Sequence, residues 1–407
     1  MNCELFCIFV AVMMKRLILG AMLSVSIAIS AQIDTLEQSL PWPHNLQVRL
    51  DSMMRDPLLD YTQVGLMVWD LTDDKPLFRM NQHQLLRPAS TMKLVTAITA
   101  LDYLGTNYQY TTSLYYKGEI TGHTLQGDIY CVGGMDPVFS SDDIENFANS
   151  VKQLGIDTIC GCIVTDATMK DTLKWGEGWC WDDNNPILSP LLVDRKNNFL
   201  MKFINALTRN DIVLQDVATK DGALAENATL ISQHKRHIDQ ILLRMMKDSD
   251  NLYAESMYYQ IAAYRSRPGK AIYAQRQEKA TMERAGLNSS QYKLADGSGL
   301  SLYNYLSAEC LLRLLRYAYI QKPIYQHLLP SLPVAGEDGT LKKRMLNTHA
   351  EGNVQAKTGT LTGIISLAGY CSASNGHRLA FAIINQGALK GKEARTFQDK
   401  ICDILCE

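Results

Sequence analysis

The sequence predicts an α+β fold in which both ends of the chain build one body and the middle forms an inserted α/β domain. Residues 61–70 are rich in β-forming residues and precede Asp73-Asp74-Lys75-Pro76 and a second apolar stretch, which is typical of a hairpin. Asn375-Gly376 between two apolar runs is a strong hairpin signal near the other end. Three strands and a closing helix are expected there, at residues 354–361, 364–371, 378–384 and 393–405.

The middle of the chain differs in pattern from both ends. Between residues 106 and 198 short strands are expected at 111–116, 127–132 and 158–164, with one helix at 142–154. A short helix at 199–208 then leads toward residue 238, after which helices dominate. We therefore expect a discontinuous catalytic domain at residues 32–105 and 199–407 and one inserted domain at 106–198.

Composition and charge limit the class of partner. The chain has 407 residues, of which 46% are hydrophobic and 20% charged, and its formal net charge is -2. Without a run of Lys or Arg it has no electrostatic footprint for a polyanion, so we expect no nucleic-acid partner.

The first 31 residues resemble a secretory signal peptide. Lys15-Arg16 precedes an apolar run at 17–29 and the small residues Ser30-Ala31, so the start codon is expected at Met13 or Met14 and cleavage near Ala31. An uncleaved anchor is the alternative, because residues 1–13 are also apolar.

No cofactor is expected. The spacings of Cys160-Gly-Cys162 and of Cys402 with Cys406 are too irregular for a zinc ribbon, and the eight histidines include no His-Glu-x-x-His. No Gly-rich phosphate loop precedes a helix, so the sequence predicts neither a metal nor a nucleotide.

Ser90-Thr-Met-Lys93 is the first candidate for catalysis. It opens a helix expected over residues 91–104, so Lys93 lies one turn from Ser90 on the same face and can act as its base. A helix N-cap is the alternative role for Ser90. The pattern recurs at Ser232-Gln-His-Lys235 and Ser290-Gln-Tyr-Lys293, but in polar segments without an apolar helix starting at the serine.

Two further motifs follow in a fixed order. Ser249-Asp-Asn251 comes after an expected helix, and Lys357-Thr-Gly359 lies in an expected strand. Ser-x-x-Lys, Ser-x-Asn and Lys-Thr-Gly in this order form the signature of penicillin-interacting serine enzymes.

With these motifs the chain resembles the D-alanyl-D-alanine carboxypeptidase and endopeptidase group of low-molecular-mass penicillin-binding proteins, the penicillin-binding protein 4 type. The resemblance implies a serine β-lactamase/DD-peptidase-like fold, with an antiparallel sheet flanked by helices and an all-helical part. Family members usually carry two inserted modules between the first two motifs, but the interval here has room for one. Further matching segments are Arg87–Thr91, Gly127–Tyr130, Gly133–Pro137, Ser249–Glu255, Asp296–Ser301, Leu332–Gly336 and Asp338–Leu341.

The resemblance implies roles for the motif residues. Ser90 would be the acylated nucleophile and Lys93 its base. Ser249 would pass a proton to the leaving amine, Asn251 would orient Lys93 and the substrate, and Lys357 would supply positive charge.

Substrate-binding roles follow in the same way. Thr358 and Thr360 would bind the terminal carboxylate, and Gly359 would let the strand approach the substrate. The backbone N–H groups of Ser90 and Thr360 would form the oxyanion hole. Thr362 would offer a hydroxyl to the third residue of the stem peptide.

Asp136, in the Gly133–Pro137 segment, would bind an amino group of that third residue. The alternative is that Asp136 only forms a turn before Pro137. Some relatives have an Arg after Gly-Ser-Gly-Leu-Ser that can pair with a carboxylate of the same side chain, whereas this chain has Leu302.

The expected function is a serine-type D-Ala-D-Ala carboxypeptidase or endopeptidase that acts on peptidoglycan stem peptides and cross-links and is acylated by β-lactam antibiotics. We expect it in the periplasm, soluble or loosely membrane-associated, without a stable anchor. A serine β-lactamase is one alternative, but no suitable Glu-x-x-x-Asn motif is present. The region instead holds a Trp-rich segment, Trp175–Trp181. An inactive penicillin-sensing or wall-binding module is the other alternative. The presence of all catalytic residue types argues against it.

Overall fold

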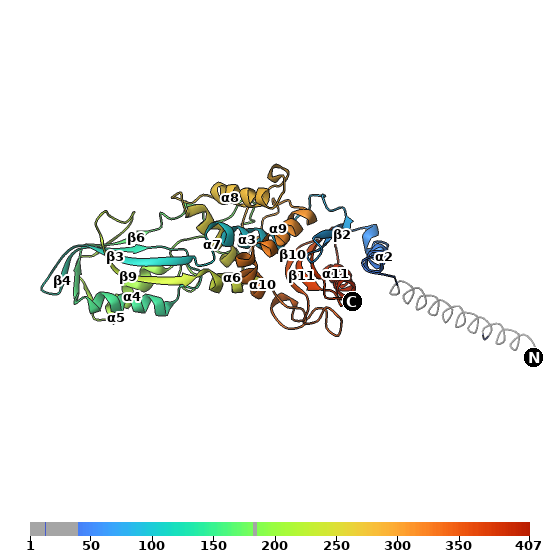
Figure 1. Cartoon of the computed structure of the whole chain (residues 1–407). Coiled ribbons are helices and arrows are strands. Elements are labelled where there is room, and N and C mark those ends of the chain that lie inside the picture. The colour runs from blue at the N-terminus through green and yellow to red at the C-terminus, as the bar shows by residue number, and fades with distance from the viewer. Residues whose placement is uncertain (1–12, 14–39, 182–184) are drawn as a thin grey trace, which may run out of the picture. The chain divides into compact units, whose positions relative to one another are not determined.

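The computed structural model describes Met13 and residues 40–181 and 185–407 (Figure 1). Apart from Met13, the expected signal peptide lies outside these ranges. Across the described part of the chain, no helix combines the length and apolar character needed to cross a membrane. The chain divides into two units, Met1–Pro57 and Leu58–Glu407, and the first contains helix α2 (His44–Met53).

The second unit contains a five-stranded antiparallel sheet built from both ends of its sequence. Strand β1 pairs with β12, so that the blue and red strands lie side by side in Figure 1. The order is β10-β11-β12-β1-β2, as expected for the hairpins at the two ends. The bounds are β1 (Gln63–Asp70), β2 (Lys75–Met80), β10 (Gln355–Leu361), β11 (Ile364–Ser372) and β12 (Arg378–Gln386).

Helices cover both faces of this sheet. The Tyr370 hydroxyl of β11 donates to the Leu315 carbonyl of α9 (Ala308–Ile320) at 2.8 Å. On α11 (Gly391–Cys406), the Gln398 side chain donates to the Ile365 carbonyl at 3.2 Å. Nearly every residue of β1, β11 and β12 is buried, which is the pattern of strands covered on both sides.

Helix α3 (Met92–Tyr103) is the centre of the helical part. All of its residues from Met92 to Leu101 are buried, as expected for a helix surrounded by other helices. Its neighbours are α6 (Ile238–Lys247), α7 (Asn251–Ala263), α8 (Ala271–Arg284), α9 and α10 (Lys322–Ser331). Short 3₁₀ turns are η1 (Pro57–Asp60), η2 (Ala89–Thr91), η3 (Ser289–Gln291) and η4 (Gly339–Leu341).

A second sheet, of seven strands, is built from the middle of the sequence. Its order is β7-β5-β4-β3-β9, and β6 pairs with β4 and β8. Strands β3, β4 and β9 pair antiparallel, whereas β5, β6, β7 and β8 join by parallel pairing. The bounds are β3 (Gln109–Thr121), β4 (Thr124–Val132), β5 (Thr158–Cys160), β6 (Cys162–Asp166), β7 (Val213–Leu214), β8 (Ala218–Asp221) and β9 (Thr229–His237).

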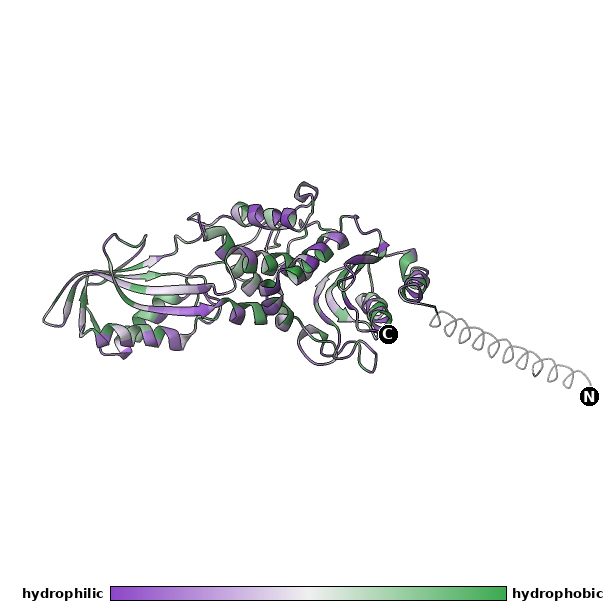
Figure 2. Cartoon of the chain, in the orientation of Figure 1, coloured by the Kyte–Doolittle hydropathy of each residue, from purple (hydrophilic) through white to green (hydrophobic). Residues whose placement is uncertain are grey.

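Helices α4 (Ser141–Gln153) and α5 (Phe199–Arg209) belong with this second sheet. Phe147 of α4 and Phe203 of α5 share a hydrophobic cluster with Ile129 and Ile163 of its strands. This cluster is separate from the larger one around α3. Figure 2 shows hydrophobic and hydrophilic residues alternating along both helices, as expected where one helix face packs on a sheet.

The expected inserted domain and the second sheet do not end at the same residue. Residues 199–237, expected in the catalytic domain, contribute α5 and strands β7, β8 and β9 to the second sheet. The expected strand at 158–164 is also broken at Gly161. A Cβ at that position would lie 2.3 Å from the Gly127 carbonyl oxygen, and the chain there separates β5 from β6.

Candidate active site

Ser90 lies in η2, directly before α3, at the boundary of sheet and helices. The turn is strained, because Ala89 has a φ of 48°. Thr91 holds the turn through its hydroxyl, which donates to the Pro88 carbonyl at 2.6 Å. The Ser90 side chain is thereby presented at the start of α3, as the sequence predicts.

The Lys93 amine contacts Ser90 and two further acceptors. Its Nζ lies 3.0 Å from Ser90 Oγ, 2.7 Å from Asn251 Oδ1 and 2.8 Å from the Ser298 carbonyl oxygen. Lys93 is completely buried, and this burial lowers its pKa to about 8, although Asp296 and other nearby carboxylates oppose the shift. A substantial fraction of neutral amine near neutral pH is what a base for a serine hydroxyl requires.

Lys357 and Ser249 form a second pair. Lys357 Nζ donates to Ser249 Oγ at 2.8 Å and to the Thr358 carbonyl at 2.8 Å. Burial lowers the Lys357 pKa well below its usual value, and the charge of Lys93 lowers it further. Ser249 has a φ of 58°, so the residue before Asp250 and α7 is also in a strained conformation.

Two glycines allow the backbone segments of the site to approach one another. A Cβ on Gly359 would lie 2.1 Å from Ser366 Oγ and 3.0 Å from the Ser90 nitrogen. On Gly299, which has a φ of 78°, a Cβ would lie 1.9 Å from the Ala89 carbonyl oxygen. Both positions therefore require glycine for packing against the Ser90 turn.

The three threonines on and after the Lys-Thr-Gly strand differ in their surroundings. Thr358 Oγ1 lies 2.7 Å from Thr340 Oγ1 of η4. Thr360 is exposed, and its Oγ1 accepts a hydrogen bond from Arg395 of α11 at 3.4 Å. Thr362 is exposed in the turn between β10 and β11.

Asp136 is held in an internal ion pair. It is 3% exposed and accepts hydrogen bonds from the Val138 N–H at 2.9 Å and from Arg236 Nε at 3.2 Å. His234 Nε2 lies 3.9 Å from the same carboxylate. The bond to Val138 is the turn-forming arrangement that the sequence left as the alternative. The geometry favours that alternative over a substrate-binding carboxylate.

Sequence reasoning gave no role to Asp296 and noted the Trp-rich segment Trp175–Trp181 without assigning it one. The Trp179 indole donates to Asp296 Oδ2 at 2.8 Å, whereas Trp175 and Trp181 are 51% and 83% exposed. Arg395 and Thr340 are further contacts of the site to which the sequence gave no role. Asp296 and Thr340 lie in the matching segments Asp296–Ser301 and Asp338–Leu341, whereas no motif included Arg395.

The other two Ser-x-x-Lys copies lack the Ser–Lys geometry. Ser232 and Lys235 lie on β9, where residues three apart point to opposite faces. The Ser290 hydroxyl is exposed and donates to Asn288 Oδ1 at 2.7 Å.

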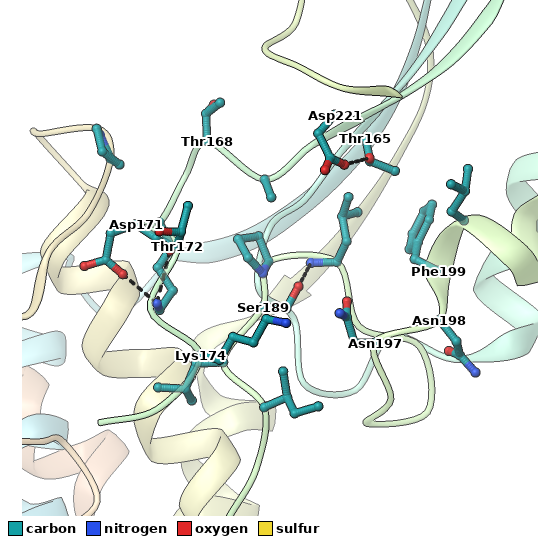
Figure 3. A pocket seen from close by; sticks show the side chains of 18 of the residues that line it. Thr165, Thr168, Asp171, Thr172, Lys174, Ser189, Asn197, Asn198, Phe199 and Asp221 are labelled. Atoms are coloured by element: carbon teal, nitrogen blue, oxygen red, sulfur yellow. Dashed lines mark hydrogen bonds and ion pairs between the residues drawn. The ribbon is translucent and has the colours of Figure 1, made fainter. Parts of the chain in front are cut away.

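A large cavity also opens beside the second sheet, away from these motifs. It has a volume of about 890 Å³, and its lining includes Lys174, Ser189 and Phe199 but none of the motif residues (Figure 3). Several of its polar groups are already paired, such as Thr165 with Asp221 at 2.5 Å. The chemistry of the three motifs is therefore concentrated at the Ser90 turn.

Comparisons with known proteins agree with this arrangement. The family model of the D-Ala-D-Ala carboxypeptidase 3 (S13) family matches residues 46–191 and 191–407. A D-alanyl-D-alanine carboxypeptidase of Actinomadura sp. is 26% identical, over 89% of this chain and 84% of that protein. The D-alanyl-D-alanine carboxypeptidase DacB of Haemophilus influenzae is 24% identical, over 90% of this chain and 94% of that protein.

Solved structures share the fold. Penicillin-binding protein 4 from Haemophilus influenzae has a TM-score of 0.78 and 22% identity, over 87% of this chain and 97% of that chain. The penicillin G acylated endopeptidase Bd3459 of Bdellovibrio bacteriovorus has a TM-score of 0.55 and 17% identity, over 84% of this chain and 93% of that chain. The expected fold and enzyme class are confirmed, and the chain belongs to the D-Ala-D-Ala carboxypeptidase 3 (S13) family.

Proposed function

We propose that this enzyme cleaves D-alanyl-D-alanine bonds of peptidoglycan stem peptides and cross-links through an acyl-enzyme on Ser90. The observation that carries the proposal is the 3.0 Å contact between Ser90 Oγ and the buried Lys93 amine, whose lowered pKa suits it to accept the serine proton.

In acylation, Ser90 Oγ attacks the carbonyl carbon between the two D-alanines while its proton passes to Lys93. Asn251 Oδ1 accepts a hydrogen bond from the Lys93 amine at 2.7 Å, which leaves the Asn251 amide nitrogen free to donate to a carbonyl of the substrate peptide. The bond to the terminal D-alanine then breaks, and its nitrogen takes a proton relayed by Ser249 beside Lys357. Water attack on the ester returns Ser90 to its free form.

Binding of the terminal carboxylate is assigned to the outer part of β10. Thr358 and Thr360 present hydroxyls there, and Arg395 adds a positive charge beside Thr360. The backbone N–H groups of Ser90 and Thr360 are proposed as the oxyanion hole, for which the close packing of Gly359 on the Ser90 turn is a supporting observation. Thr362 remains a candidate contact for the third residue of the stem peptide.

We further propose one inserted domain, extended to residue 237 to include the strands that pair in the second sheet. The leader at residues 1–31 supports export to the periplasm, where peptidoglycan is accessible. β-Lactams are proposed as covalent inhibitors, supported by the solved complexes of related folds with a β-lactam and with penicillin G.

The test is labelling with a fluorescent penicillin, followed by intact-mass analysis and by timing of label release. Ser90→Ala should abolish label and D-Ala-D-Ala hydrolysis, and Lys93→Ala should reduce both by at least about 100-fold. Ser232→Ala and Ser290→Ala are the matched controls and should label normally. Label on Ser90→Ala would refute the assignment, and release within seconds would indicate a β-lactamase instead.

A further inference from the structure

The carbonyl that accepts a hydrogen bond from Lys93 belongs to a segment held by two buried acids. Ser298, whose carbonyl lies 2.8 Å from Lys93 Nζ, is fully buried. Glu255 of α7 and Asp296 are each 1% exposed and flank this segment. Buried carboxyl groups are costly unless they are paired or hydrogen-bonded, so their contacts here need an explanation.

Glu255 holds the segment from the side of α7. Its Oε1 accepts from the Gly297 N–H at 3.1 Å and from the Ser298 N–H at 2.8 Å. The Ser298 nitrogen and carbonyl are thus fixed by Glu255 and Lys93 respectively. A shift of Glu255 would move the acceptor that directs the Lys93 amine.

Asp296 holds the other side of the same loop. Its carboxylate accepts from the N–H groups of Gly299 at 2.8 Å and Ser301 at 2.7 Å, and from Asn304 Nδ2 at 2.7 Å. The loop therefore folds around Asp296. Of the two acids, Glu255 is the one that reaches the loop from a helix, α7, which also carries the motif residue Asn251.

We propose that Glu255 is a positioning residue for acylation, which holds the Ser298 carbonyl against the Lys93 amine and places a buried acid beside that amine. The proposal rests on the proposed function, in which Lys93 is the base. Glu255 touches neither the nucleophile nor, in this arrangement, the substrate, so it acts through Ser298 and through its charge.

The electrostatics of the site support this role. Burial, and after it the charge of Asp296, raise the Glu255 pKa to about 8, while the hydrogen bonds from Ser298 and the charge of Lys93 oppose the rise. The Lys93 pKa also lies at about 8, so Lys93 and Glu255 titrate in one range as a coupled pair. The other titratable groups that face this pair are Asp250, Asp296, Lys357, Lys170, Glu278, Tyr258 and Tyr259.

Two variants separate the charge of Glu255 from its hydrogen bonds. Glu255→Gln keeps an oxygen that can accept from both N–H groups but cannot carry charge. Near and above pH 8, where Glu255 is ionised, the amide removes an anion that favours protonated Lys93, so the midpoint of the rise of the acylation rate with pH should move down by about 0.5 to 1 pH unit. Glu255→Ala removes the acceptor and should lower the high-pH plateau about 10- to 100-fold.

Glu278→Gln is the matched control. Glu278 is also a fully buried acid near the site, and burial raises its pKa well above the usual value. It accepts a hydrogen bond from Thr96 Oγ1 at 3.1 Å, however, and the carboxylates that raise the Lys93 pKa are Asp296, Glu255 and Asp250. Its pH profile should match that of the unmodified enzyme. For D-Ala-D-Ala peptides, Glu255→Ala should lower kcat with little change in KM, because the residue does not bind substrate.

The experiment measures second-order penicillin acylation of the full chain from pH 6 to 10, with circular dichroism to verify folding. A downward shift for Glu255→Gln, absent in Glu278→Gln, supports the proposal. An unchanged or upward-shifted Glu255→Gln profile overturns it, even if Glu255→Ala fails to fold. If the unmodified protein takes no label on Ser90, the proposed function fails, and this inference fails with it.

Discussion

Replacement of Asp136 by alanine distinguishes a carboxylate that stabilises the fold from one that binds substrate. Asp136 is 3% exposed, and burial raises its pKa, against the opposing effects of the Val138 N–H and Arg236. Loss of one partner of a buried ion pair costs about 3–5 kcal/mol. Arg236 would keep Asp143 as a partner at 3.7 Å and is 16% exposed, so we expect the free energy of unfolding to fall by an amount at or just below the lower limit of that range, about 2–3 kcal/mol.

The assay combines urea unfolding with two rates, measured per folded molecule. Penicillin acylation and hydrolysis of a D-alanyl peptide with a free amine at its third residue should change by the same factor, whereas the unfolding midpoint should fall. Adding Arg236→Ala should cost less than the sum of the two single changes, because the unpaired guanidinium is removed too. A peptide-specific loss of about 10- to 100-fold with unchanged stability would refute this reasoning and return Asp136 to the substrate site.

Three further predictions concern the Ser90 turn and its surroundings. Penicillin acylation should rise about tenfold per pH unit below pH 8 and level off above it, because only neutral Lys93 accepts a proton; a flat profile from pH 6 to 9 would exclude Lys93 as the base. Arg395→Ala should raise KM for D-Ala-D-Ala peptides about 3- to 10-fold through loss of charge beside Thr360, and an equal effect on a substrate with an amidated terminus would contradict this. Gly359→Ala should lower acylation at least about 100-fold, since its Cβ would lie 2.1 Å from Ser366 Oγ; normal acylation with intact folding would show that β10 can move.

The parts of the fold that the sequence predicted have strong local signals. The strands at both ends are largely apolar and flank turns of two to five residues, so their pairing as hairpins follows from neighbouring sequence. Strands β7, β8 and β9 were missed because they are short or polar: every residue of β8 is exposed, and β9 contains Gln233, His234, Lys235 and Arg236. No apolar periodicity marks such strands, and only their partners in the sheet define them.

The same distinction applies to the site. Ser90 and Lys93 are one helical turn apart, so their contact could be predicted from spacing alone. The partner of Asp136 could not, because Arg236 lies 100 residues further along the chain. The role of Glu255 likewise depends on a loop more than 40 residues away, and its position in a matching motif gave no indication of its contacts.

Helix α7 connects these observations. At its first residue, Asn251 contacts Lys93, and one turn later Glu255 holds the Ser298 segment. The next residues on its buried surface reach the loop that follows β4: the Ser256 hydroxyl donates to the Met135 carbonyl, and Gln260 Nε2 donates to the Gly134 carbonyl at 2.6 Å. A rigid helix buried along its length transmits displacement from one end to the other. The Gly133–Pro137 loop is thereby attached to the helix whose Asn251 holds the Lys93 amine, which gives that loop a structural reason to be present whether or not Asp136 ever contacts substrate.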